Sequence, residues 1–152
     1  MRKLGCVLII VATLLLDLLS KMWVSHVFYV GEVLPVLPSF NVTLAHNTGA
    51  AFSFLAHESG WQRYFLSGLA IVMSIIFSVW LFRTPVKHHW TRVGLSLIIG
   101  GAIGNVIDRL QYGYVIDFLD FFVGVHHWPA FNVADSAICI GTGLLLMGMK
   151  ES

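Results

Sequence analysis

The stretch that decides the fold is GGAIGNVIDRLQYGYVIDFLDFFVGVHHWPAFNVADS, from Gly100 to Ser136. It lies between two long apolar runs of the kind that cross membranes. Its aspartates are Asp108, Asp117, Asp120 and Asp135. An ionisable side chain beside a membrane-spanning run is costly unless it is paired or hydrated, so it marks a functional site. The stretch therefore predicts an acidic site at the edge of a membrane.

Composition points to the same environment. Hydrophobic residues make up 57% of the 152-residue chain and charged residues only 11%, whereas soluble domains carry about 25% charged residues. A formal net charge of +1 gives no support for binding nucleic acid. The two cysteines, Cys6 and Cys139, lie inside apolar runs, so neither a disulfide framework nor a thiolate metal site is expected.

Four apolar runs have about the 20 residues that cross roughly 30 Å of hydrocarbon. They cover residues 4–24, 64–82, 93–110 and 131–149. The first run follows Arg2 and Lys3 as a signal peptide would, but it is long and no small-residue cleavage site follows it. We therefore expect one integral-membrane domain over residues 1–152, with four transmembrane α-helices.

The basic residues predict how these helices are oriented. Six of the nine Lys and Arg residues lie in the N-terminus, the connection between the second and third runs, and the C-terminus. The positive-inside rule then places both termini in the cytoplasm. The outer segment 30–62 is too polar to span. Its alternation at Phe40–Leu44 predicts a strand and Asn47-Thr48-Gly49 predicts a turn, so we expect a small sheet on the outer membrane surface.

This orientation puts polar residues of three helices at one depth. With a rise of 1.5 Å per residue, Asp17 lies roughly 20 Å up the first helix. Asn105 and Asp108 fall near the outer end of the third, and Asp135 lies about 6 Å below the start of the fourth. Scattered structural polar residues would not converge in this way.

Asp117 and Asp135 have the features of a hydrolytic pair. Asp117 stands between Ile116 and Phe118, an apolar setting that raises the pKa of a carboxyl group. Two carboxyl groups that share one proton let one act as a base on water and the other as an acid. A helix-cap role is the structural alternative for Asp135, although the apolar run predicts a helix that already begins at residue 131.

Other polar residues permit two interpretations each. Asp17 and Lys21 are four apart with the acid first, which favours an ion pair. Lys21 also faces Ser25, so a Ser/Lys nucleophile pair is the alternative, although Asp17 would keep the lysine protonated. The third run ends with Asn105, Asp108 and Arg109. This group predicts either a polar clamp between helices or a supporting shell for the acid pair.

At these residues the chain resembles the lipoprotein signal peptidase (signal peptidase II, prolipoprotein signal peptidase) family. The matching segments are Asp17 and Lys21, NTGAAFS at 47–53, GGAIGNVIDRL at 100–110, GYVIDFLDF at 113–121 and FNVADSAI at 131–138. The resemblance implies a multi-pass aspartyl endopeptidase of the bacterial inner membrane, with four helices and a small extracytoplasmic β-cradle. Such an enzyme cuts the signal peptide before the diacylglyceryl-modified cysteine of a prolipoprotein.

The resemblance also implies roles for particular residues. By motif, Asp117 and Asp135 match the catalytic pair near the extracytoplasmic face. The supporting pocket positions match Asp17, Lys21, Asn47, Gly49, Asn105, Asp108, Arg109, Asn132 and Ala134. Phe52 and Phe54 of the outer loop are expected to cover the site. The implied partners are diacylglyceryl-prolipoproteins, membrane lipids and the cyclic peptide antibiotics that inhibit the family, with no metal or cofactor.

Two other functions remain open from the residues themselves. Buried acids also mark proton pathways, so a small transporter is one alternative. Transport activity without peptide cleavage would favour it. The other is a metal-dependent enzyme like the CDP-alcohol phosphotransferases, although the aspartate spacing here differs from that motif. Loss of activity in a chelator would favour that alternative.

Overall fold

The computed structural model describes residues 2–49 and 60–149. The elements in chain order are α1 (Lys3–Val27), β1 (Val33–Leu37), β2 (Phe40–Asn47), α2 (Gln62–Arg83), α3 (His89–Tyr112), β3 (Val115–Val123), β4 (His126–His127) and α4 (Val133–Met149). Each predicted apolar run is a helix. Helices α1, α2 and α3 are long and apolar enough to cross a membrane, and α4 is a shorter apolar helix of 17 residues.

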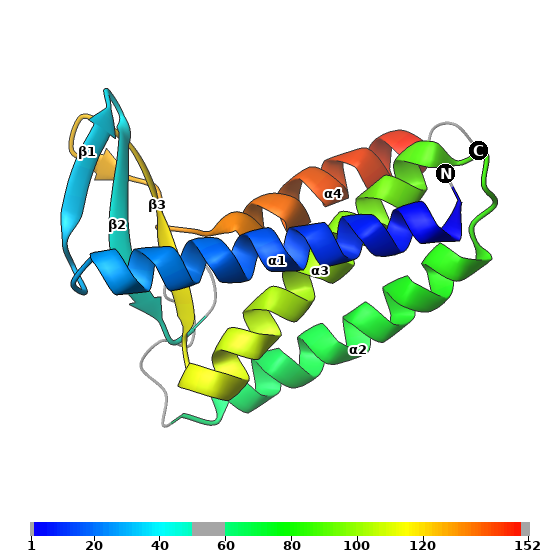
Figure 1. The fold of residues 1–152 in the computed structure, drawn as a ribbon, viewed down its shortest axis with the longest axis horizontal. Helices are drawn as coiled ribbons and strands as arrows, with labels where there is room; N and C mark the ends of the chain where they lie inside the picture. Colours follow the sequence, from blue (N-terminus) through cyan, green and yellow to red (C-terminus); the bar gives the residue numbers. More distant parts are fainter. Residues whose placement is uncertain (1, 50–59, 150–152) are drawn as a thin grey trace.

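The helices form an elongated bundle with the sheet at one end (Figure 1). The start of α1, the connection from α2 to α3 and the end of α4 lie together at the opposite end (Figure 1). The segments that carry Arg2, Arg83 and Lys87, at the start of α1 and between α2 and α3, therefore lie at the end away from the sheet. This is the arrangement expected from the charge pattern, and its assignment to the two membrane faces stays a prediction.

Helix α3 is the centre of the bundle and contacts α1, α2 and α4. Glycines allow the close approach. A Cβ atom on Gly100 would lie 2.9 Å from the carbonyl oxygen of Ile10 in α1, and one on Gly94 would lie 2.6 Å from that of Gly141 in α4. Glycines at these positions thus let the helix backbones pack closely. The apolar cluster around α3 consists of Cys6, Leu81, Leu95, Ile98, Ile99 and Leu145.

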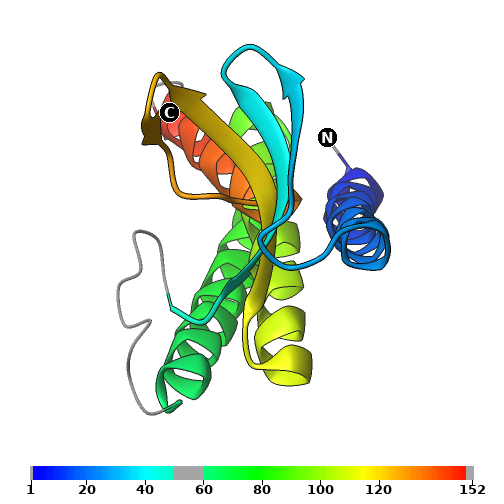
Figure 2. The same cartoon turned by 90° about the vertical axis from the view of Figure 1, so that its left-hand side faces the viewer.

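The described strands form an antiparallel sheet in the order β1-β2-β3-β4, which covers the end of the bundle (Figure 2). The predicted strand and sheet are present, and the chain bends at the predicted turn, where the Gly49 N–H donates to Asn47 Oδ1 at 3.1 Å, but this turn does not join β1 to β2. The β1–β2 turn lies at residues 38–39, where Ser39 has φ 71°. Asn47 is instead the last residue of β2 and pairs with Val115 of β3, a strand that the sequence pattern did not predict.

The C-terminal end of α3 and the N-terminal end of α4 lie beside this sheet and position the candidate site residues. Helix α3 ends at Gly113, whose φ of 85° suits a left-handed C-cap, and the chain enters β3 directly. Helix α4 begins at Val133, so the prediction of a start at residue 131 is wrong. The Oδ1 atom of Asn132 accepts a hydrogen bond from the Asp135 backbone N–H at 2.9 Å. Asn132 is therefore the cap residue, and Asp135 lies in the first turn.

Candidate functional site

Asp117 lies on β3 with its carboxylate held by two amides. Asn132 Nδ2 donates to Oδ1 at 2.8 Å and Asn47 Nδ2 donates to Oδ2 at 3.0 Å. The residue is 2% exposed. Burial raises the pKa of Asp117 to about 7, and the charge of Asp135 adds to the rise against the two amides and Lys21. Asp117 is thus poised to hold a proton near neutral pH, as its apolar neighbours predict.

Asp135 approaches from the other side, in the half-buried first turn of α4. Asn105 Nδ2 donates to its Oδ1 at 2.7 Å. The Asn105 amide oxygen in turn accepts a hydrogen bond from Asn132 Nδ2 at 3.2 Å. A chain of two amides therefore joins the carboxyl groups of Asp117 and Asp135. The charge of Asp135 also helps to raise the pKa of Asp117.

Beneath the amides lies a buried ammonium group. Lys21 is 1% exposed, and its Nζ contacts Asp17 Oδ2 at 2.7 Å, Asp108 Oδ2 at 2.9 Å and Asn105 Oδ1 at 3.1 Å. The predicted ion pair of Asp17 and Lys21 is confirmed. The pairing with Asp108 was not predicted, because it joins two different helices.

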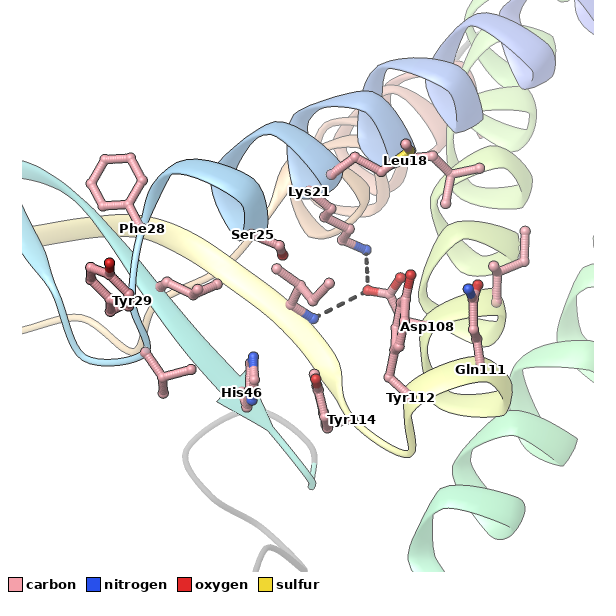
Figure 3. A pocket seen from close by; sticks show the side chains of 15 residues that line it. Leu18, Lys21, Ser25, Phe28, Tyr29, His46, Asp108, Gln111, Tyr112 and Tyr114 are labelled. Carbon is pink, nitrogen blue, oxygen red and sulfur yellow. Dashed lines mark hydrogen bonds and ion pairs between the residues drawn. The ribbon is translucent and has the colours of Figure 1, made fainter.

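Each carboxylate of this cluster also holds a backbone group. Asp17 Oδ1 accepts a hydrogen bond from the Ala134 N–H at 2.8 Å. Asp108 Oδ2 accepts one from the Ile116 N–H at 3.1 Å, next to its contact with Lys21 (Figure 3). These two backbone donors come directly before Asp135 and Asp117 in the chain.

The remaining predicted residues lie at the edge of the same network. Arg109 makes long hydrogen bonds of 3.5 Å to the carbonyl oxygens of Asn105 and Gly49. The Gly49 N–H donates to Asn47 Oδ1 at 3.1 Å, which turns the Asn47 amide nitrogen toward Asp117. All the predicted site residues are thus connected by hydrogen bonds or ion pairs. Phe52 and Phe54, the predicted cover, lie outside the described residues.

A cavity of about 520 Å³ opens beside Asp135. Its polar residues include Asn47, Asn105 and Arg109, and an apolar wall is formed by the segment 128–131. Sequence reasoning missed this wall. The apolar run Trp-Pro-Ala-Phe at residues 128–131 could have indicated the wall. This run comes directly before Asn132, so it lies too close to α4 to belong to a separate loop. The arrangement can hold an apolar chain next to the Asp135 carboxyl group.

A second cavity, of about 590 Å³, lies on the other side of β3 (Figure 3). Val115 lines the first cavity and Ile116 the second, because successive side chains of a strand point to opposite faces. Ser25 lines this second cavity. In the described part of the chain no hydrogen bond joins Ser25 to Lys21, which argues against a Ser/Lys nucleophile pair.

Fold and site together define a helical membrane protein with a buried acid and amide network at one end of the bundle. Two solved structures titled as bacterial membrane enzymes, determined in meso at 2.3 Å and 1.9 Å resolution, share this fold. The first has a TM-score of 0.86 and 30% sequence identity, and covers 97% of this chain and 88% of its own. The second has a TM-score of 0.84 and 28% identity, and covers 95% and 92%.

Sequence comparison identifies the family. The family model of signal peptidase (SPase) II matches residues 9–150. A lipoprotein signal peptidase of Photorhabdus laumondii is 49% identical over 139 residues, which are 91% of this chain and 83% of that protein. One of Shewanella pealeana is 50% identical over 139 residues, which are 91% and 82%. The chain belongs to the signal peptidase II family and is a membrane protease of lipoprotein processing.

Proposed function

We propose that the chain is an aspartyl endopeptidase that removes signal peptides from diacylglyceryl-modified prolipoproteins, cutting before the lipidated cysteine. The observation that carries this proposal is the approach of Asp117 and Asp135 across the Asn105 and Asn132 amides. The relatives' name, lipoprotein signal peptidase, supports the substrate class. We place the reaction at the outer face of the bacterial cytoplasmic membrane, since the sheet end lies opposite the basic segments.

In this mechanism the acid pair works with a single shared proton. The ionised carboxyl group takes a proton from water as the water oxygen attacks the scissile carbonyl carbon. The protonated carboxyl group then gives its proton to the leaving nitrogen as the C–N bond breaks. A pKa of about 7 keeps Asp117 largely protonated below neutral pH. We therefore expect the cleavage rate to fall as the pH rises beyond about 7, because Asp117 then loses the proton that it has to donate.

The surrounding residues suit an apolar, membrane-embedded substrate. Trp128 and Phe131 line one wall of the cavity, against which the apolar part of a signal peptide packs. Asn47 and Arg109 supply hydrogen-bond donors at the polar side, close to where the scissile bond must lie. Together they bind and orient the substrate, while the aspartates do the chemistry.

The decisive experiment replaces each aspartate by its amide. Asp117→Asn and Asp135→Asn should each lower cleavage of a diacylglyceryl-prolipoprotein by about 1,000-fold or more, because an amide cannot exchange the proton. Asp120→Asn is the matched control, since Asp120 lies on the same strand but bonds to Asn41 and His127 instead. It should cleave normally.

Retention of near-normal cleavage by a folded Asp117→Asn or Asp135→Asn variant would disprove the mechanism. A chelator should have no effect on the rate. Transport of ions by the protein in liposomes, with no cleavage, would point to a proton pathway instead.

A further inference from the structure

We propose that Lys21 is a positioning residue for the reaction, setting the Asn105 amide and, through Asp17 and Asp108, the two chain segments that carry the aspartates. This inference rests on the proposed function of Asp117 and Asp135. It concerns a side chain that touches neither of them by hydrogen bond in the described structure.

The first step of the argument is the saturation of the ammonium group. An ammonium has three N–H donors and no acceptor. Lys21 Nζ has three acceptors, Asp17 Oδ2 at 2.7 Å, Asp108 Oδ2 at 2.9 Å and Asn105 Oδ1 at 3.1 Å. No N–H is left for substrate, so the group is built to hold protein atoms in place.

The second step concerns the direction of the Asn105 amide. Its oxygen faces both Lys21 Nζ and Asn132 Nδ2, which are donors. A flipped amide would turn an NH₂ group toward an ammonium and lose its acceptors. Lys21 therefore fixes the Asn105 nitrogen toward Asp135 Oδ1, at 2.7 Å. The same oxygen orients Asn132, whose Nδ2 holds Asp117 Oδ1.

The third step concerns the backbone. The two carboxylates bound to Lys21 accept the N–H groups of Ala134 and Ile116. Each donor immediately precedes one aspartate of the pair. The cluster therefore sets the position of α4 along α1, and the position of β3 along α3. Figure 3 shows the Asp108 carboxylate between the Lys21 ammonium and β3. The Lys21 ammonium group thus positions Asp135 through Asp17, and Asp117 through Asp108.

The test is a double-mutant cycle between Lys21→Met and Asn105→Ala, read as kcat and KM for diacylglyceryl-prolipoprotein. We expect Lys21→Met to lower kcat by about 100-fold while KM changes by less than about threefold, because substrate contacts stay in place. If Lys21 acts through Asn105, the double variant should be no more than about threefold slower than the slower single variant. A normal kcat for folded Lys21→Met would overturn the proposal, and effects that multiply would overturn the route through Asn105.

Lys21→Arg keeps the positive charge and guards against a variant that does not fold. Its N–H groups diverge from three nitrogens, so they cannot converge on acceptors arranged around one atom. We expect kcat about 10-fold below that of the parent protein, with the thermal unfolding midpoint in detergent little changed. An unaltered kcat would contradict the positioning role.

Ser25→Ala serves as the matched control on the same helix. Its side chain lines the second cavity and makes no contact with the acid pair. It should leave kcat and KM unchanged. The aspartate variants separate the two proposals: if they remain active the mechanism fails, whereas if they are inactive and Lys21→Met is normal only the positioning role fails.

Discussion

Two buried cations hold the bundle together, one near each end, and their partners differ. Lys21, at the sheet end, contacts the carboxylates of Asp17 and Asp108. Arg92, toward the other end and 2% exposed, has no ion pair with any acid in the described chain. It donates instead to the carbonyl oxygens of Leu81 and Thr84 and to the sulfur of Cys6.

The difference shows what each cation stabilises. Carbonyl oxygens at the C-terminal end of α2 carry partial negative charge, so they accept hydrogen bonds from the Arg92 guanidinium. These hydrogen bonds connect α3 to α2 and to α1, and they do not continue to the candidate site. The carboxylates around Lys21 bond onward to the Ala134 and Ile116 N–H groups. Arg92 therefore stabilises the packing of the helices, whereas Lys21 both stabilises the packing and positions the segments of the candidate site.

The largest expected effect tests the cluster of carboxylates around Lys21. A Cβ atom on Gly104 would overlap Asp17 Oδ2, so Gly104→Ala must push that carboxylate away from Lys21. We expect kcat for prolipoprotein cleavage to fall by about 100-fold, which corresponds to about 2.7 kcal/mol of transition-state stabilisation. Gly143→Ala is the control, because a Cβ there meets nothing within 4 Å. Normal activity of Gly104→Ala would remove the contrast between the two clusters.

Arg92 should show the opposite behaviour, with a loss of stability and no loss of activity. Arg92→Met loses the hydrogen bonds to Leu81, Thr84 and Cys6, so the free energy of unfolding should fall by about 2 kcal/mol. The folded fraction should keep its kcat. Unfolding curves in detergent, measured together with cleavage, check both statements. A fully folded Arg92→Met protein with greatly reduced kcat would show that the hydrogen bonds of Arg92 also control the site.

The acid pair itself should make stability depend on pH. The pKa of Asp117 is raised from 3.8 to about 7 by burial and by Asp135, so the folded state binds a proton that the unfolded state has released. Stability from this group is present below about pH 4 and is lost as the pH rises toward 7. Asp117→Asn removes this loss, so the variant should be more stable than the parent protein above pH 7, and its stability should decline less between pH 4 and pH 7.

Thermal unfolding of both proteins across this pH range measures the effect. Equal pH dependence in the parent and in Asp117→Asn would mean that another group carries it.

The smallest effect is expected at the tip of the sheet. His127 bonds to Asp120 at 2.8 Å, but its side chain is 52% exposed. Exposed pairs contribute little, so His127→Gln should change the free energy of unfolding by less than about 1 kcal/mol. Asp120→Ala should cost about 1–2 kcal/mol, since it also leaves the buried Asn41 amide without its partner. Unfolding midpoints that rank the two variants in reverse would contradict this.

The sequence allowed the helices and the membrane environment to be predicted, because apolar length is a local property. Strand β3 escaped prediction for a physical reason. Its residues Val115–Phe118 are all buried, so apolar side chains do not alternate with polar ones. The start of α4 was misplaced because Phe131 is apolar like the helix but pairs with Leu119 of the sheet.

The site was predicted in part by depth and in part by family resemblance. The Asp17–Lys21 pair could be inferred from a spacing of four residues. The bond from Lys21 to Asn105 spans 84 positions and the bond from Ala134 to Asp17 spans 117, so no local pattern encodes them. Only the packing of α3 between α1 and α4 brings these groups together.

That long reach has a consequence for biosynthesis. The carboxylate on α1 meets its backbone partner on α4 only after the last helix has entered the bilayer. Under the proposed mechanism, a nascent chain that still lacks α4 has no ordered acid pair, so it should not cleave peptide bonds until the bundle is complete.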